Sequence, residues 1–106
     1  MATNARQKRV ARAAEKIEVE MRRVGLWQDT PLDPRLYDFE QAFAMDTMAF
    51  SQWLQFVFLP RVREAIASNE FPSESSVGAQ AVREFDGAPE AGRLVTLLSE
   101  FDDQFS

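Results

Sequence analysis

Carboxylates are the main groups in this 106-residue chain that could do acid–base chemistry, because it contains no histidine and no cysteine. Asp46, Glu64 and Asp86 are the candidates for a general acid and base. Nothing in their spacing brings two of them together with a nucleophile, and Asp46-Thr47 is typical of a cap or turn before a helix. Zinc–thiolate sites and thiolate catalysis are excluded. We therefore predict that the chain is not an enzyme and uses no metal or cofactor.

A row of basic residues is the first candidate binding feature. Lys8, Arg12 and Lys16 follow one another at i, i+4 and i+8, and Arg23 lies on the same side of the predicted helix. Like charges at this spacing mildly destabilise a helix, which favours an anionic partner such as RNA. The alternative is a solvated face, because glutamates are interleaved, no aromatic residues are placed to stack bases, and the net charge is −5. We favour the solvated face, and RNA stays open as the weaker hypothesis.

An aromatic cluster near the middle of the chain is the second candidate. Its members are Phe50, Trp53, Phe56 and Phe58. A pocket lined by Trp53 and Phe56 would indicate small-molecule binding. Packing of the hydrophobic core explains the cluster better, because a small helical domain needs large side chains to fill its interior.

A partner surface is expected beside this cluster. Between Trp53 and Leu59 the chain is apolar on every side of a helix, whereas each flanking helix covers a stripe of only about 100°. We expect the segment 26–50 to fold across the helix as a cover. The uncovered edge should then lie at Phe58 and Val62, with Arg61 at the rim, a composition found in protein contacts.

Four helices are predicted, near residues 3–24, 52–67, 77–86 and 89–105, with no β-sheet. Thr3 and Ser51 are the expected N-caps, and Pro60 should kink the second helix. The segment 26–50 contains Asp-Thr-Pro and Asp-Pro turns and is expected to be mostly irregular. The fold class is all-α, a four-helix bundle or an irregular array.

The predicted core consists of the residues that repeat along the helical faces. They are Val10, Ile17, Met21, Val24, Trp53, Leu54, Val57, Leu94, Leu98 and Phe101. Asp102 and Asp103 are expected on the exposed face of the last helix. A single domain spanning 1–106 is long enough to bury such a core without disulfides.

The longest apolar run, Phe56 to Pro60, is far shorter than the roughly 20 residues that cross a membrane. No apolar leader is apparent near Met1, so we expect no membrane association and a cytoplasmic protein.

Two stretches of the sequence resemble a known family. They are Phe43-Ala44-Met45-Asp46-Thr47-Met48 and Trp53-Leu54-Gln55-Phe56-Val57-Phe58-Leu59-Pro60-Arg61. On these residues the chain resembles the YqcC-like family of small proteobacterial proteins over most of its length. The resemblance implies a single four-helix domain of uncharacterised function, with no catalytic residue to carry over. Some relatives are labelled tRNA pseudouridine synthase C, which we attribute to genes that stand beside that enzyme.

Protein–protein contact is the function that these observations favour. The partner is unknown, and a homodimer is one form that such a module takes. The alternative is an accessory RNA-binding or tRNA-modification protein that uses the basic face, and the third hypothesis is binding of a small ligand within the helical array. Asp46, Thr47, Trp53 and Pro60 are expected to act structurally.

Overall fold

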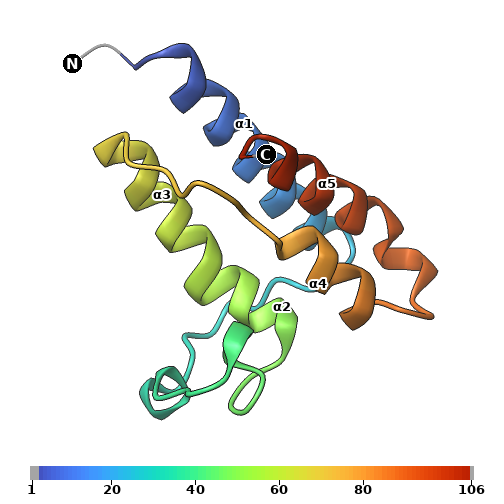
Figure 1. Cartoon of the computed structure of the whole chain (residues 1–106). Helices are drawn as coiled ribbons and strands as arrows, with labels where there is room; N and C mark the ends of the chain where they lie inside the picture. The colour runs from blue at the N-terminus through green and yellow to red at the C-terminus, as the bar shows by residue number, and fades with distance from the viewer. Residues whose placement is uncertain (1–2, 106) are drawn as a thin grey trace.

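The computed structural model describes residues 3–105, and this part of the chain is all-helical, which confirms the predicted fold class (Figure 1). Its elements are α1 (Ala5–Arg23), the 3-10 turns η1 (Pro34–Tyr37) and η2 (Ala42–Ala44), α2 (Phe50–Trp53), the π-helix η3 (Leu54–Phe58), α3 (Leu59–Ser68), α4 (Val77–Glu84), the 3-10 turn η4 (Pro89–Ala91) and α5 (Gly92–Asp103). Helix α1 packs on α3 and on α5, and α4 packs on α5.

Helix α1 follows from its sequence pattern and its ends. Its buried apolar side chains recur every three or four residues and face the core. Asn4, rather than the expected Thr3, is the N-cap: its side chain accepts from the Gln7 amide while the Gln7 side chain accepts from the Asn4 amide, both at 2.8 Å. This reciprocal pair is a capping box, which Thr3 is one residue too early to form. After the helix, Gly25 turns the chain at φ 77°, in the left-handed region that glycine favours.

The second predicted helix is a succession of α2, η3 and α3. It begins at Phe50 with Ala49 as N-cap, so the expected cap Ser51 is wrong. The side-chain carbonyl of Gln52 accepts from the Ala49 amide at 2.9 Å and secures this earlier start. Pro60 follows the π-helix and is tolerated inside the helical run because the wider turn precedes it. The sequence pattern did not predict the π-helix.

The π-helix places two aromatic rings on one face. Trp53 and Phe58 are five residues apart, which would put them about 140° apart around a regular α-helix. In the structure their rings stack with centroids 5.5 Å apart. Phe58 in turn contacts the ring of Phe101 from α5 at 5.0 Å, edge to face. The wider turn therefore links the rings of α2 to those of α5.

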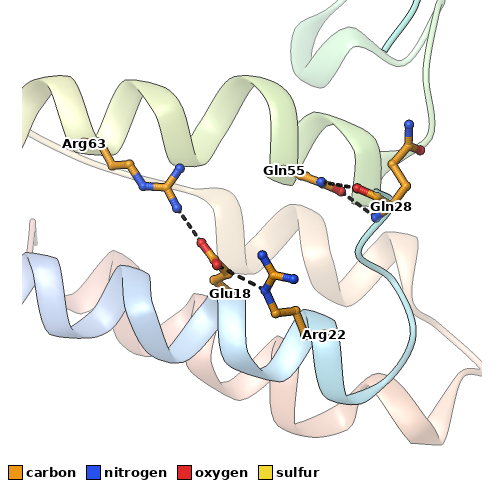
Figure 2. Close-up of polar contacts among 5 residues, drawn as sticks. All are labelled: Glu18, Arg22, Gln28, Gln55 and Arg63. Atoms are coloured by element: carbon orange, nitrogen blue, oxygen red, sulfur yellow. Dashed lines mark hydrogen bonds and ion pairs between the residues drawn. The ribbon is translucent and has the colours of Figure 1, made fainter. Parts of the chain in front are cut away.

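The segment 26–49 is irregular apart from the turns η1 and η2, as predicted, and lies at the α2 end of the central helical run (Figure 1). Gln55 holds its start: the Gln55 side-chain carbonyl accepts from the Gln28 amide at 3.0 Å, and the Gln55 side-chain amide donates to the Gln28 carbonyl at 2.8 Å (Figure 2). Further along, the ring of Phe43 lies 4.9 Å from that of Trp53. The segment therefore packs on α2 and on the start of η3, which is the first part of the helix that it was predicted to cover.

Helices α4 and α5 approach each other very closely. A Cβ atom on Gly78 would lie only 2.6 Å from the Cα of Ser99, so the contact requires glycine. Asp102 accepts from the amides of Val77 and Gly78, at 3.0 and 2.7 Å, and thereby caps the start of α4. This corrects the expectation that Asp102 is simply exposed on the last helix.

The hydrophobic core contains the residues predicted for it, except that Val24 is only half-buried. Residues Val10, Ile17, Met21, Leu54, Leu94 and Leu98 are fully enclosed. Val24 is less buried than predicted because it is the C-cap of α1, where the chain turns away from the core.

Candidate functional site

The predicted partner surface at Phe58, Arg61 and Val62 is a pocket and not an exposed patch. Phe58 and Val62 are only 8% and 7% exposed, so the expectation of an exposed apolar edge is wrong. The ring of Phe101 and the segment after α3 cover the side of the helix that carries Phe58 and Val62, which a helical wheel alone would leave exposed. The two side chains line one pocket, and the exposed Arg61 lies beside them at its opening.

This pocket, which we call the aromatic pocket, measures about 160 Å³. Its walls come from α1, the end of η3, α3, the segment 71–75, α5 and the residues just after α5. The lining residues are Val10, Phe58, Arg61, Val62, Ala65, Phe71, Pro72, Glu74, Ser75, Phe101 and Phe105. It is not lined by Trp53 or Phe56, so the cavity available to a small ligand lies further along the helix than expected.

Arg6 of α1 contributes a second positive charge near this pocket. Its guanidinium lies 4.9 Å from the ring centre of Phe71 and 5.6 Å from that of Phe105. Such cation–π contacts hold the cation over the ring faces. The lining of the pocket therefore combines apolar walls with one arginine, Arg61, and one carboxylate, Glu74, while Arg6 lies over two of its rings without being part of the lining.

The basic face of α1 keeps three of its four predicted members available. Lys8, Arg12 and Lys16 are exposed and pair with no carboxylate within the described residues 3–105. Arg9 joins them and, with Arg12 and Lys16, lines a cleft of about 190 Å³ between α1 and α5. Sequence reasoning missed Arg9, although its i, i+3 spacing to Arg12 places the two side by side.

Arg23 does not belong to this basic face. Its guanidinium donates to the carboxylate of Glu20, with Nε 2.8 Å from Oε1, and Arg93 of α5 lies 3.7 Å from the same carboxylate. The hydrogen bond from Arg23 lowers the pKa of Glu20, while burial of Glu20 opposes that shift and the positive charges of both arginines support it. The i, i+3 spacing explains why Arg23 turns to Glu20 and leaves the row of cations.

Glu18 links α1 to α3, as Glu20 links α1 to Arg93 of α5. Figure 2 shows Arg22 and Arg63 reaching the Glu18 carboxylate from the two helices. Arg22 also lies over the ring of Trp27, 4.5 Å from its centre. These arginines are committed to contacts within the domain.

The residues assigned a structural role occupy the cover and the central helices. The carboxylate of Asp46 accepts from the amides of Glu40 and Gln41, at 3.0 and 3.3 Å, and the hydrogen bond from Glu40 lowers the Asp46 pKa, while desolvation opposes that shift. Thr47 donates its hydroxyl to the Leu36 carbonyl at 2.6 Å. Both contacts close turns of the segment 26–49, so the geometry agrees with the expectation for Asp46-Thr47.

Residues 3–105 contain neither a cluster of metal ligands nor a helix that could span a membrane. No three carboxylate side chains in this range converge as ligands for a metal ion. In the same range, no helix is long and apolar enough to cross a membrane.

The fold and these surfaces define a small all-helical domain with one aromatic pocket and one basic face. The chain belongs to the DUF446 family, described as "tRNA pseudouridine synthase C", whose model matches residues 9–104. This match confirms the family resemblance seen in the sequence. No solved structure matches the chain significantly.

Two relatives show how this domain occurs elsewhere. An uncharacterised protein of Haemophilus influenzae is 31% identical over 88 residues, which are 79% of this chain and 80% of that protein. A protein of Pectobacterium carotovorum named tRNA pseudouridine synthase C is 33% identical over 63 residues, 59% of this chain but only 17% of that protein. The chain thus resembles a minor part of the named synthase, and the family description alone does not show catalysis.

Proposed function

We propose that this chain is a non-catalytic binding domain that works by protein contact, with a tRNA pseudouridine synthase as its partner. The observation that carries the proposal is the match to 17% of the Pectobacterium protein. A related domain is thus a small part of a larger protein named as a synthase, and it makes up most of a small protein in Haemophilus. A domain that occurs in both settings is suited to acting beside the enzyme.

The geometry supports contact at the aromatic pocket. The pocket is apolar inside and bordered by the exposed Arg61, and arginine beside aromatic side chains is enriched where protein interfaces gain most of their energy. Glu18 and Gln55, by contrast, make their hydrogen bonds to other residues of the domain and are not available to a partner.

The test is binding between the purified chain and the separately produced synthase of the same organism. We expect a defined complex by size-exclusion chromatography and a measurable heat by calorimetry. Arg61→Glu should weaken this complex, whereas Arg83→Glu, which changes another exposed arginine on α4, should not. Absence of a complex with the unmodified chain contradicts the proposal, and sedimentation of the chain alone shows whether it forms a homodimer instead.

RNA binding by the basic face is the second candidate. It is favoured by the exposure of Lys8, Arg12 and Lys16 without carboxylate partners in the described part of the chain, and by the tRNA substrate in the name of the Pectobacterium relative. Phosphate contacts release counterions, so affinity for tRNA should fall steeply with salt.

A charge-matched pair of variants tests this candidate. Lys8→Gln with Arg12→Gln should reduce the slope of log affinity against log salt by roughly 1–2, the value for two lost phosphate contacts. Arg61→Gln with Arg83→Gln removes the same charge elsewhere and should leave that slope unchanged. Equal effects of the two pairs would show that only net charge matters.

A further inference from the structure

We propose that the aromatic pocket receives one aromatic side chain of a partner protein and that Arg61 binds a carboxylate on a residue next to it. This inference rests on the proposed function, because it assigns the pocket to a protein segment. It adds the chemistry of the segment that is recognised, which is one benzene-sized ring beside one acidic group.

The size of the pocket limits its occupant. A cavity of about 150 Å³ lined by apolar side chains holds one benzene molecule. The aromatic pocket, at about 160 Å³, has room for one such ring. Four phenylalanines line it, namely Phe58, Phe71, Phe101 and Phe105. An inserted ring can meet these rings edge to face, an arrangement that stabilises aromatic pairs beyond the burial of area.

The unpaired Arg61 favours an anionic neighbour for that ring. The lining holds one arginine, Arg61, and one carboxylate, Glu74, and these two make no ion pair with each other. Arg6 is placed over the rings of Phe71 and Phe105, whereas Arg61 is exposed and makes no ion pair within residues 3–105. A free guanidinium beside an apolar pocket is suited to bind a carboxylate through two parallel hydrogen bonds.

The wall formed by the segment 71–75 is fixed before any partner arrives. The Ser75 hydroxyl donates to the Asp102 carboxylate at 2.6 Å, which ties the end of this segment to α5. The rings of Phe71 and Phe105 lie 5.9 Å apart and close the same side. A preformed pocket loses less conformational entropy when it binds, so a single anchoring side chain gains affinity there.

Three short peptides probe the pocket directly in the full chain, labelled with ¹⁵N for NMR. Acetyl-Phe-Asp-amide carries the ring and the carboxylate, acetyl-Phe-Asn-amide removes the charge, and acetyl-Ala-Asp-amide removes the ring. We expect saturable shifts confined to the lining residues for the first two. The Phe-Asp peptide should bind about threefold tighter than the Phe-Asn peptide, the contribution of an exposed ion pair. The third peptide should not bind.

Variants separate the ring site from the charge site. Arg61→Gln should abolish the preference for Phe-Asp over Phe-Asn, and Arg83→Gln should keep it. Ala65→Phe places a ring inside the pocket and should weaken both phenylalanine peptides at least tenfold, whereas Ala67→Phe, on an exposed position of α3, should not. The unmodified chain and the three peptides suffice for the test if the Ala65 variant does not fold.

The outcomes distinguish this inference from the proposed function. Shifts that do not saturate, that spread beyond the pocket or that occur equally with the alanine peptide overturn the inference. A synthase complex that Ala65→Phe leaves intact also overturns it, while the proposed function stands. Saturable binding of the phenylalanine peptides without any synthase complex supports the pocket and contradicts the synthase as partner.

Discussion

The helices α1, α4 and α5 and the segment 26–49 reach their structures by different means. In the helices, apolar residues recur with the helical period, and the buried set follows from that repeat. The segment has no such repeat. It buries the scattered apolar side chains of Leu32, Ala44 and Met48. Its backbone is also bound by polar side chains, namely Gln55 from the central helices and Asp46 and Thr47 from within the segment.

This difference separates two sources of stability. Burial of apolar area involves many neighbours at once, so one lost side chain weakens the whole domain. A hydrogen bond to backbone is made by one pair of groups, so its loss should first release the part of the chain that it holds. Substitutions at Leu98, Gln55, Asp102 and Asp46 should separate the two sources of stability.

Truncation of Leu98 should have the largest effect. This side chain is fully enclosed in α5, and Leu98→Ala should lower the free energy of unfolding by about 2–5 kcal/mol, as cavity-forming changes in a core do. Urea denaturation followed by circular dichroism measures the loss. A change below about 1 kcal/mol would place Leu98 outside the core and would remove the basis of the comparison.

Replacement of Gln55 should have a smaller and more local effect. Gln55→Leu keeps the size of the side chain but leaves the Gln28 amide and carbonyl without partners, which should cost roughly 1–3 kcal/mol. Hydrogen exchange should accelerate mainly within 26–49. Gln41→Leu, on an exposed side chain of the same segment, is the control. Uniform acceleration across all helices would contradict a local role.

Asp102 tests a polar anchor within the helical region. Asp102→Asn replaces a carboxylate that accepts from the Ser75 hydroxyl and from two amides at the start of α4. We expect a loss of about 1 kcal/mol, the usual contribution of an N-cap. Glu100→Gln removes the same charge from an exposed position of α5 and should change less. Thermal unfolding of both variants measures their losses of stability. Equal losses would show that net charge, and not the cap, is responsible.

Asp46 should give the smallest effect, and it should depend on pH. Its pKa is lowered in the folded chain, so the charged carboxylate stabilises the fold above the unfolded pKa, and that contribution is lost as the pH falls through the folded pKa. Asp46→Asn should therefore lower the melting temperature at neutral pH and approach the unmodified chain below the ordinary aspartate range. A difference that persists unchanged in acid would rule out the carboxylate as the cause.

Features that depend on a single helix or a single turn could be predicted from the sequence. The apolar repeat placed Ile17 and Leu98 in the core, and the Asp-Pro turns indicated the irregular segment. The role of Asp102 was missed because its partners lie 24 to 27 residues earlier in the chain, and no local pattern joins them.

The candidate site could be predicted only in part, for the same reason. Phe58, Arg61 and Val62 line one pocket, but whether the side of the helix that carries them is open or covered depends on the position of α5 and of the segment 71–75. The pairing of Arg23 with Glu20, by contrast, uses an i, i+3 spacing that the sequence contains.

The π-helix before Pro60 sets the rotation between the two parts of the central helical run. A wide turn of this kind accommodates one residue more than an α-helix does, so it fixes which side of α3 faces the same way as the ring of Trp53. Deleting one residue between Leu54 and Phe58 would rotate Val62 and Ala65 by about 100° relative to Trp53. The two sides of the aromatic pocket would then no longer meet, so relatives that share the pocket should share the extra residue.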